Sequence, residues 1–195
     1  MVLTRRSQKR IAAALGMLGL LLLLPGCPLS PDKDDGGGDP DDTREIPRDS
    51  VRGALARLEQ VWEQKDFRGY EDLLHTGFRF YIRDDEASDF PWLPNPYWGR
   101  TEELDFASNM FDTNFTGENP PVQSIEWEFN VLNEVITTDV DGESVTEVTA
   151  DAIITVLTGP SDGWRSDTRF IFDVIADPDE EGLFQIKRQA EVLKL

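Results

Sequence analysis

The sequence predicts an α+β fold in which about three N-terminal helices pack against a long antiparallel sheet. Two patterns indicate this class. Apolar residues recur at helical spacing in the first half of the folded region, and they alternate with polar residues in the second half. The chain has 195 residues and one cysteine, Cys27, so the core must hold the fold together without a disulfide. We expect one domain over residues 45–195, a length sufficient for one core.

The helices and the first strand are predicted from the spacing of apolar residues. Residues 47–65 carry one amphipathic face, formed by Val51, Leu55, Leu58 and Trp62. A second helix is expected over residues 67–75, with Gly77 ending it. Residues 78–83 alternate and predict a strand, and residues 101–111 predict a third helix.

The C-terminal half is predicted to form four long strands. Alternating apolar residues mark these strands at 125–131, 148–156, 170–174 and 184–192. In the last strand, the alternation gives one inward face formed by Phe184, Ile186, Arg188, Ala190 and Val192. Arg188 is therefore a candidate ligand-binding residue, paired inside a pocket, or else it lies at a strand end where the core opens.

The loop predicted over residues 84–99 carries an unusual number of aromatic residues, namely Phe90, Trp92, Tyr97 and Trp98. Trp92 and Tyr97 are candidate ligand-binding residues, because aromatic side chains on loops often cover a binding site. The same side chains could instead close the core, and we favour structural packing for Trp98, which adjoins the third helix.

Several short motifs in this order resemble those of the nuclear transport factor two-like superfamily, also called SnoaL-like or cystatin-like. Residues 62–83 match a helix followed by "D-x-x-x-Y-x-x-L-L" and an "F-x-F" strand, Gly99-Arg100 precedes the third helix, and residues 182–188 resemble the closing "G-x-W-x-I-x-R" strand. The resemblance covers roughly residues 45–195. It implies a strongly curved sheet wrapped around the helices, forming a cone with an apolar pocket.

His75 is the only histidine, and so the only side chain whose usual pKa lies near neutrality. It could be an acid–base group lining the cone, or a polar residue closing a helix. Enzymes of this superfamily, such as ketosteroid isomerase, scytalone dehydratase and limonene epoxide hydrolase, use carboxylate or histidine chemistry inside the cone. The sequence matches none of their catalytic sets, so apart from the candidate His75 we assign no catalytic residue. We expect no cofactor and no metal site.

The N-terminus has the pattern of an export signal. Basic residues precede an apolar run at 11–24, and Leu24-Pro25-Gly26-Cys27 resembles the lipobox of bacterial lipoproteins. The resemblance implies that residues 1–26 are removed and that Cys27 carries acyl chains such as palmitate. Residues 27–44 form an acidic, Gly- and Pro-rich segment that we expect to be a disordered tether. Because Pro28 stands where Asp would retain the protein at the inner membrane, the outer membrane facing the periplasm is favoured.

Charge limits the partners of this chain. Residues 1–26 contain four basic and no acidic residues, so their removal would take the net charge from −19 to −23. Such a chain repels nucleic acid. The expected partners are the membrane, reached through the lipid anchor, and a small apolar ligand or a protein partner bound without catalysis. A homodimer could form through the outer sheet face, with Arg79, Tyr81, Ile153 and Ile171. The alternative is a small lyase, isomerase or hydrolase that uses His75 in the cone pocket.

Overall fold

The computed structural model describes residues 44–83, 95–117 and 119–194. By internal contacts the chain divides into the units Met1–Thr43 and Arg44–Leu195, and the description below concerns the second unit. The predicted signal, the tether and Cys27 therefore lie outside the described residues, as does Trp92.

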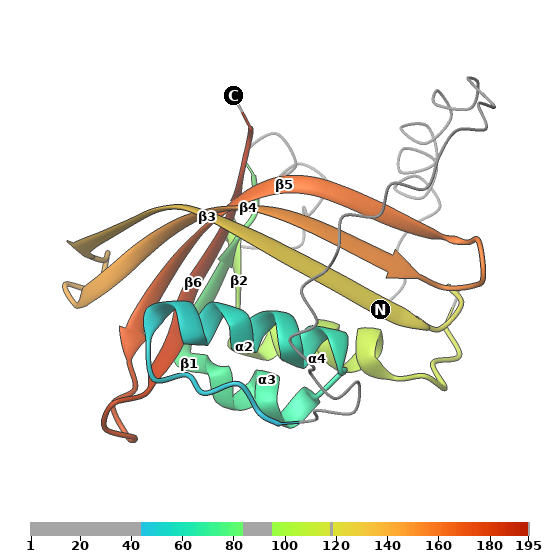
Figure 1. Ribbon diagram of the computed structural model, residues 1–195, viewed down its shortest axis with the longest axis horizontal. Coiled ribbons are helices and arrows are strands. Elements are labelled where there is room, and N and C mark those ends of the chain that lie inside the picture. Colours follow the sequence, from blue (N-terminus) through green and yellow to red (C-terminus); the bar gives the residue numbers. More distant parts are fainter. Residues whose placement is uncertain (1–43, 84–94, 118, 195) are drawn as a thin grey trace, which may run out of the picture. The chain divides into compact units, whose positions relative to one another are not determined.

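Three helices lie on one face of the curved sheet (Figure 1): α2 (Val51–Glu63), α3 (Phe67–Leu73) and α4 (Arg100–Phe111). Polar side chains fix where they begin. Ser50 Oγ accepts the backbone N–H of Gly53 at 3.0 Å, and Asp66 Oδ1 accepts that of Gly69 at 3.0 Å. These caps satisfy N–H groups in the first turn that have no partner inside the helix.

The six strands form one sheet in the order β2-β1-β6-β5-β4-β3. Their bounds are β1 (Leu74–Tyr81), β2 (Tyr97–Gly99), β3 (Ser124–Thr138), β4 (Ser144–Leu157), β5 (Gly163–Ala176) and β6 (Phe184–Val192). All neighbours are antiparallel except β1 and β6, which run parallel. The predicted α+β class is thus confirmed, with one parallel pair that the sequence did not indicate.

Several boundaries differ from the sequence prediction, and three of these differences affect the candidate site. The second helix ends at Leu73, so Gly77 lies within β1 instead of ending the helix. The predicted loop contains the short strand β2, which pairs with β1. Strand β3 continues beyond its predicted end at Val131 to Thr138. The sequence did not indicate this extension, because the second half is exposed on both faces and no alternation of apolar and polar residues marks it.

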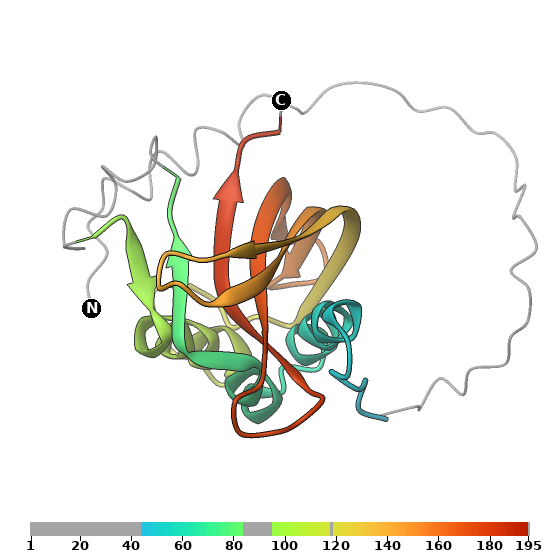
Figure 2. The ribbon, with the colours of Figure 1, turned by 90° about the vertical axis from the view of Figure 1, so that its left-hand side faces the viewer.

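The β3–β4 hairpin is long enough for its end to lie across β6 and β1 (Figure 2). Its turn is held there by side chains of those two strands. Lys187 of β6 donates to Asp139 at 2.5 Å and also to Glu143, and Arg79 of β1 donates to Asp141 at 3.2 Å. The last residues of the hairpin therefore pack on strands that are not their neighbours in the sheet.

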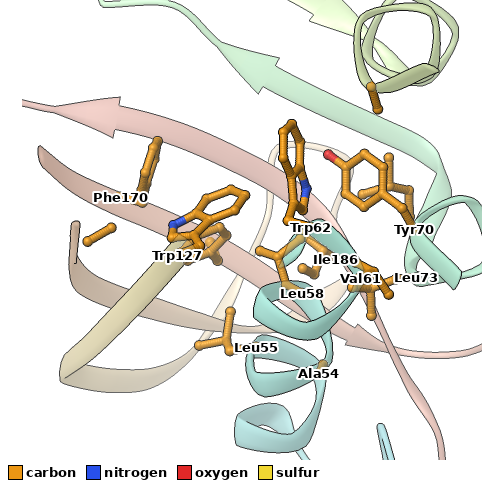
Figure 3. Close-up of a cluster of buried hydrophobic side chains, with 14 of the residues drawn as sticks. Ala54, Leu55, Leu58, Val61, Trp62, Tyr70, Leu73, Trp127, Phe170 and Ile186 are labelled. Carbon is orange, nitrogen blue, oxygen red and sulfur yellow. The ribbon is translucent and has the colours of Figure 1, made fainter. Parts of the chain in front are cut away.

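The core lies between α2 and the sheet, and large aromatic side chains fill it (Figure 3). The ring centroid of Trp62 lies 5.4 Å from that of Tyr70, 5.0 Å from that of Phe111 and 5.1 Å from that of Trp127. All three pairs pack edge to face, the arrangement that aromatic rings prefer. The predicted inward face of the first helix is confirmed by the burial of Leu55, Leu58 and Trp62.

Candidate functional site

An extra residue in β6 changes which of its side chains face the core. Val174 of β5 lies opposite Ile186, whereas the preceding Asp173 lies opposite Arg188, so Lys187 is left as the extra residue of a bulge. The prediction that Arg188 faces inward with Ile186 is therefore wrong, because alternation assumes an unbroken ladder. The bulge turns Arg188 to the outer face, away from the helices, and turns Gln189 inward instead.

Arg188 belongs to a row of charged residues that crosses the outer face of four strands. The register places Glu147, Asp173, Arg188 and Arg79 next to one another on β4, β5, β6 and β1. Arg188 Nη2 lies 2.9 Å from Glu147 Oε2, and Arg188 Nε lies 2.7 Å from Asp173 Oδ2. Burial raises the pKa of Asp173 above its usual value, although the guanidinium of Arg188 acts against this rise.

The turn of the β3–β4 hairpin closes over this row. Lys187 Nζ lies among the carboxylates of Asp139, Asp141 and Glu143. Burial alone would lower the pKa of Lys187, but the bonds from these carboxylates raise it above its usual value. The hollow that remains under the turn measures about 20 Å³, and Arg79 and Arg188 are among its lining residues. That volume is sufficient for about one water molecule and too small for an organic ligand.

His75 lies on this outer side of the sheet and not inside the cone. Its neighbour Leu74 faces the core opposite Ile186, and the charges that act on the imidazole are those of Lys187, Glu143, Asp177 and Asp139. Burial, followed by the charge of Lys187, lowers the pKa of His75. The alternative that places His75 in the cone pocket is therefore contradicted, because strand β1 begins at Leu74 and turns the imidazole outward.

The charged group that does lie inside is Glu103 of α4, which the sequence reading missed. Its side chain is buried, accepting the hydroxyl of Tyr70 at 2.5 Å on one oxygen and the indole N–H of Trp98 at 2.7 Å on the other. Burial raises the pKa of Glu103, while these two bonds lower it by a smaller amount. Glu103 precedes Ala107 and Phe111 by four and eight residues, so its position on the buried helical face was a usable signal.

A second polar group faces inward near the end of β6. Glu191 lies opposite the buried Phe170, accepts the hydroxyl of Thr168 at 2.6 Å and lies 3.8 Å from Arg83. The sequence prediction placed this residue on the outer face, because it counted the alternation of β6 without the bulge. Glu191 is thus an acidic side chain on the inner face of β6.

Comparison with known proteins supports the fold. No protein-family model matches the sequence, and no curated protein shows a significant match. A conserved protein from Planctomyces limnophilus is 16% identical with a TM-score of 0.50, over 73% of this chain and 94% of that chain. A nuclear transport factor two-like protein of unknown function in nutrient uptake, from Rhodospirillum rubrum, is 11% identical with a TM-score of 0.48, over 75% of this chain and 99% of that chain.

This chain shares the α+β fold of the Planctomyces limnophilus protein. The order of helices and strands and the curved sheet are those that the resemblance implied. The beta subunit of the benzoate 1,2-dioxygenase from Burkholderia mallei is also similar, at 15% identity and a TM-score of 0.48, over 77% of this chain and 93% of that chain. At 16% identity the likeness to the Planctomyces limnophilus protein establishes the fold and nothing about chemistry.

Side chains fill much of the space in which the resemblance seen in the sequence implied an apolar pocket. The cluster around Trp62 and Trp127 occupies the region between α2 and the sheet (Figure 3). Phe129 and Phe172 extend it with ring centroids 5.3 Å apart. Two hollows among the described residues lie elsewhere, under the hairpin turn and beside β3.

The other predicted ligand-binding residues are not brought together inside the cone. Tyr97 lies on the outer face of β2, where its ring packs 5.2 Å from that of Tyr81 and the guanidinium of Arg79 lies 5.6 Å from its centroid. It is thus a neighbour of the row that contains Arg188. Trp98 stacks on Phe80 at 4.7 Å, as expected for structural packing. Trp92 lies outside the described residues.

Neither metal ligands nor a membrane helix is found in the described ranges. Among residues 44–83, 95–117 and 119–194, no group of His, Cys, Asp and Glu side chains is arranged to hold a metal ion. In the same part of the chain, no helix combines the length and apolar character needed to cross a bilayer.

Proposed function

We propose that this chain is a lipoprotein of the bacterial cell envelope, anchored through acylated Cys27 at the outer membrane facing the periplasm. Its domain binds a protein partner there without catalysis. The anchor is supported by the sequence alone, through the basic start, the apolar run and the lipobox-like Leu24-Pro25-Gly26-Cys27. Multiple acyl chains give durable attachment, because each buried methylene contributes about 0.8 kcal/mol.

The observation that carries the proposal of a binding role is the occupied interior. Aromatic side chains fill the region around Trp62, and both oxygens of the buried Glu103 already accept hydrogen bonds from Tyr70 and Trp98. A general base must reach the proton that it abstracts, and Glu103 is committed to two protein donors. A filled interior also disfavours a small apolar ligand, so a protein partner bound at the surface is the better proposal.

Replacement of Cys27 by Ser tests the anchor. The sulfur of Cys27 is the only thiol in the chain, so the variant has no other site for thioether acylation. We expect Cys27→Ser to move the protein from the membrane fraction to the periplasmic fraction, and to abolish incorporation of labelled palmitate. Unchanged fractionation of the variant would contradict the proposed anchor.

Native mass spectrometry of the periplasmic Cys27→Ser chain tests the binding role. We expect no retained small molecule, because the described interior is packed with aromatic rings. A small ligand that survives transfer to the gas phase would overturn the choice of a protein partner. It would favour the alternative of a small lyase, isomerase or hydrolase, whose acid–base group would then have to be Glu103 in place of His75.

A further inference from the structure

Strand β3 lies at one edge of the sheet, and no strand among the described residues pairs with its outer side. Strand β3 is the last in the six-stranded sheet, so one of its edges is free of β4. Glu59 Oε1 of α2 accepts the backbone N–H of Phe129 at 2.6 Å and thereby occupies this edge at Phe129. Among residues 44–83, 95–117 and 119–194, no group hydrogen-bonds the outer backbone edge of residues 130–138.

This free edge carries one feature that hinders strand pairing, a bulge at Leu132, where the register with β4 shifts between Val131 and Asn133. It lacks the other common ones. Residues 130–138 contain no Lys, Arg or Pro, and their one charged residue, Glu134, is paired with Arg52 at 2.7 Å. Apolar side chains are exposed on it: Leu132 is 47% exposed, Val135 47% and Ile136 79%. Natural proteins protect long exposed edges with charges, prolines, bulges or a covering element, so the regular stretch beyond the bulge, residues 133–138, indicates a place for another strand.

A hollow lies directly beside the same edge. It measures about 340 Å³ and is lined by Arg52, Val131, Leu132, Asn133 and Glu134. Strand addition gains affinity from main-chain hydrogen bonds and specificity from pockets that take alternate side chains. The hollow is placed to receive such a side chain from a segment that pairs with β3, with the Arg52–Glu134 ion pair at its rim.

The charge of this region identifies the kind of segment that fits. From Thr101 to Trp164 the chain has no Lys, Arg or His. Glu126 and Glu128 are exposed on β3, and among the described residues neither has an ion-pair partner. Burial raises the pKa of Glu59 beside the edge, and the charges of Glu63 and Glu128 add to the rise. A second copy would bring like charges together, and the acidic, Pro-containing residues 28–43 are equally unsuited.

We infer that residues 130–138 of β3 and the adjoining hollow bind an extended, basic and apolar protein segment, which adds to the sheet as a further strand. The inference rests on the proposed function, because it names the class of protein partner that the domain binds. The apolar side chains of the segment would face the exposed residues from Leu132 onward, and basic side chains at its other end would lie toward Glu128, the nearest acidic residue along the strand before residue 130.

Three synthetic peptides, matched in length to the free edge, test this inference on the full chain in detergent. The first alternates lysine and valine, the second has the same composition with a central proline, and the third alternates glutamate and valine. We expect only the first to bind, and binding to weaken as salt is added. The central proline cannot donate a ladder hydrogen bond, and the glutamates meet like charges.

A pair of protein variants locates the binding. Ile136→Lys should weaken the lysine–valine peptide by about tenfold, because an apolar cross-strand pair is lost and a like charge faces the peptide. Leu193→Lys introduces the same charge at a residue that is 59% exposed just beyond the end of β6, and this variant should bind the peptide normally. The peptide should also slow hydrogen exchange at backbone amides of residues 130–138.

Equal binding by Ile136→Lys, equal binding of the proline peptide, or unaltered exchange in β3 would each overturn the inference. If the unaltered chain self-associated and Ile136→Lys abolished that association, the inference would also be overturned, because a second copy of the chain would then occupy the edge. Failure of the proposed anchor is measured separately. Ile136→Lys should remain in the membrane fraction, and the Cys27→Ser chain should still bind the peptide.

Discussion

Glu103 couples the stability of the domain to pH. Burial raises the pKa of this carboxyl above that of the unfolded chain. The folded state therefore binds the proton more tightly, and the resulting stability is complete below the unfolded pKa of about 4.3. It is lost as the pH rises through the folded pKa. We expect Glu103→Gln to remove this loss, so that urea unfolding of the variant depends less on pH between acid and neutral conditions.

The matched control is Glu126→Gln, which changes an exposed carboxylate on β3. Its unfolding free energy should follow the pH dependence of the unaltered chain. If the unfolding free energies of the unaltered chain and of Glu103→Gln changed with pH in parallel between acid and neutral conditions, Glu103 would not be the titrating group.

The hydroxyl of Tyr70 contributes to the same buried contact. Tyr70→Phe keeps the ring against Trp62 but removes one donor from the carboxylate of Glu103. Because a hydrogen bond to a charged buried group contributes about 1.5–3 kcal/mol, we expect a loss of that size in the free energy of unfolding at neutral pH. Tyr97→Phe, at a half-buried ring on the outer face, should cost less than about 0.5 kcal/mol. Equal losses in the two variants would contradict the assignment.

At the level of single residues, the sequence predicted apolar burial better than polar partnership. Leu55, Leu58 and Trp62 could be placed because one helical face contains them all. The burial of Glu103 could have been predicted, because Glu103 lies one helical turn before the buried Ala107 on the same face of α4. Its partners could not, because Tyr70 and Trp98 reach it from a different helix and from a strand that the sequence did not predict.

At the level of elements, Lys187 fastens the end of the β3–β4 hairpin to β6. The side chain of Asp139 is 4% exposed, and that of Lys187 is 6% exposed. Removing one partner of a buried pair typically costs about 3–5 kcal/mol, because the other charge stays buried. Asp141 and Glu143 can turn to solvent, so we expect Lys187→Met to cost about 3 kcal/mol in the free energy of unfolding. Hydrogen exchange at the hairpin turn should quicken as well.

Two further variants distinguish loss of the Lys187–Asp139 ion pair from a general loss of packing. Lys187→Met combined with Asp139→Asn should recover part of the loss, since no uncompensated carboxylate remains in the buried position. Lys194→Met removes a lysine that pairs with the exposed Asp167, and should cost no more than about 1 kcal/mol. A double variant as unstable as Lys187→Met would contradict the assignment.

The Lys187–Asp139 ion pair also makes the stability of the domain depend on pH in the acid range. Burial acts to raise the pKa of Asp139, but the bond from Lys187 lowers it overall. Its contribution to stability is therefore present above the unfolded pKa of about 3.9 and is lost as the pH falls through the folded pKa. The variant that carries both Lys187→Met and Asp139→Asn should lack this loss in acid unfolding.

Strand β6 shows where prediction of elements from sequence stops. The strand itself was predicted correctly, because apolar residues alternate along it. The bulge at Lys187 was not predicted, because nothing in the composition of the strand marks one unpaired residue. That residue nevertheless exchanges the two faces of the strand for every residue after it. The predicted role of Arg188 inside a pocket depended on that phase, and so did the outward placement of Glu191.

For the whole molecule, two hydrogen bonds tie residues 44–46 to helix α2. The carbonyl of Arg44 accepts Gln60 Nε2 at 2.8 Å, and the backbone N–H of Ile46 donates to Gln60 Oε1 at 2.8 Å. Gln60 is a buried polar residue of α2, so these two bonds satisfy groups that solvent reaches poorly. Residues 1–43 form a separate unit by internal contacts.

Two truncations test this boundary by thermal unfolding. A chain that begins at Arg44 should unfold within about 2 °C of the full chain, a shift that corresponds to less than about 1 kcal/mol for a domain of this size. A chain that begins at Pro47 loses both bonds to Gln60 at about 1 kcal/mol each, so its midpoint should fall by about 4–8 °C. Equal midpoints for the two truncations would show that residues 44–46 do not belong to the cooperative unit. A large fall in the first would show that stability extends into residues 1–43.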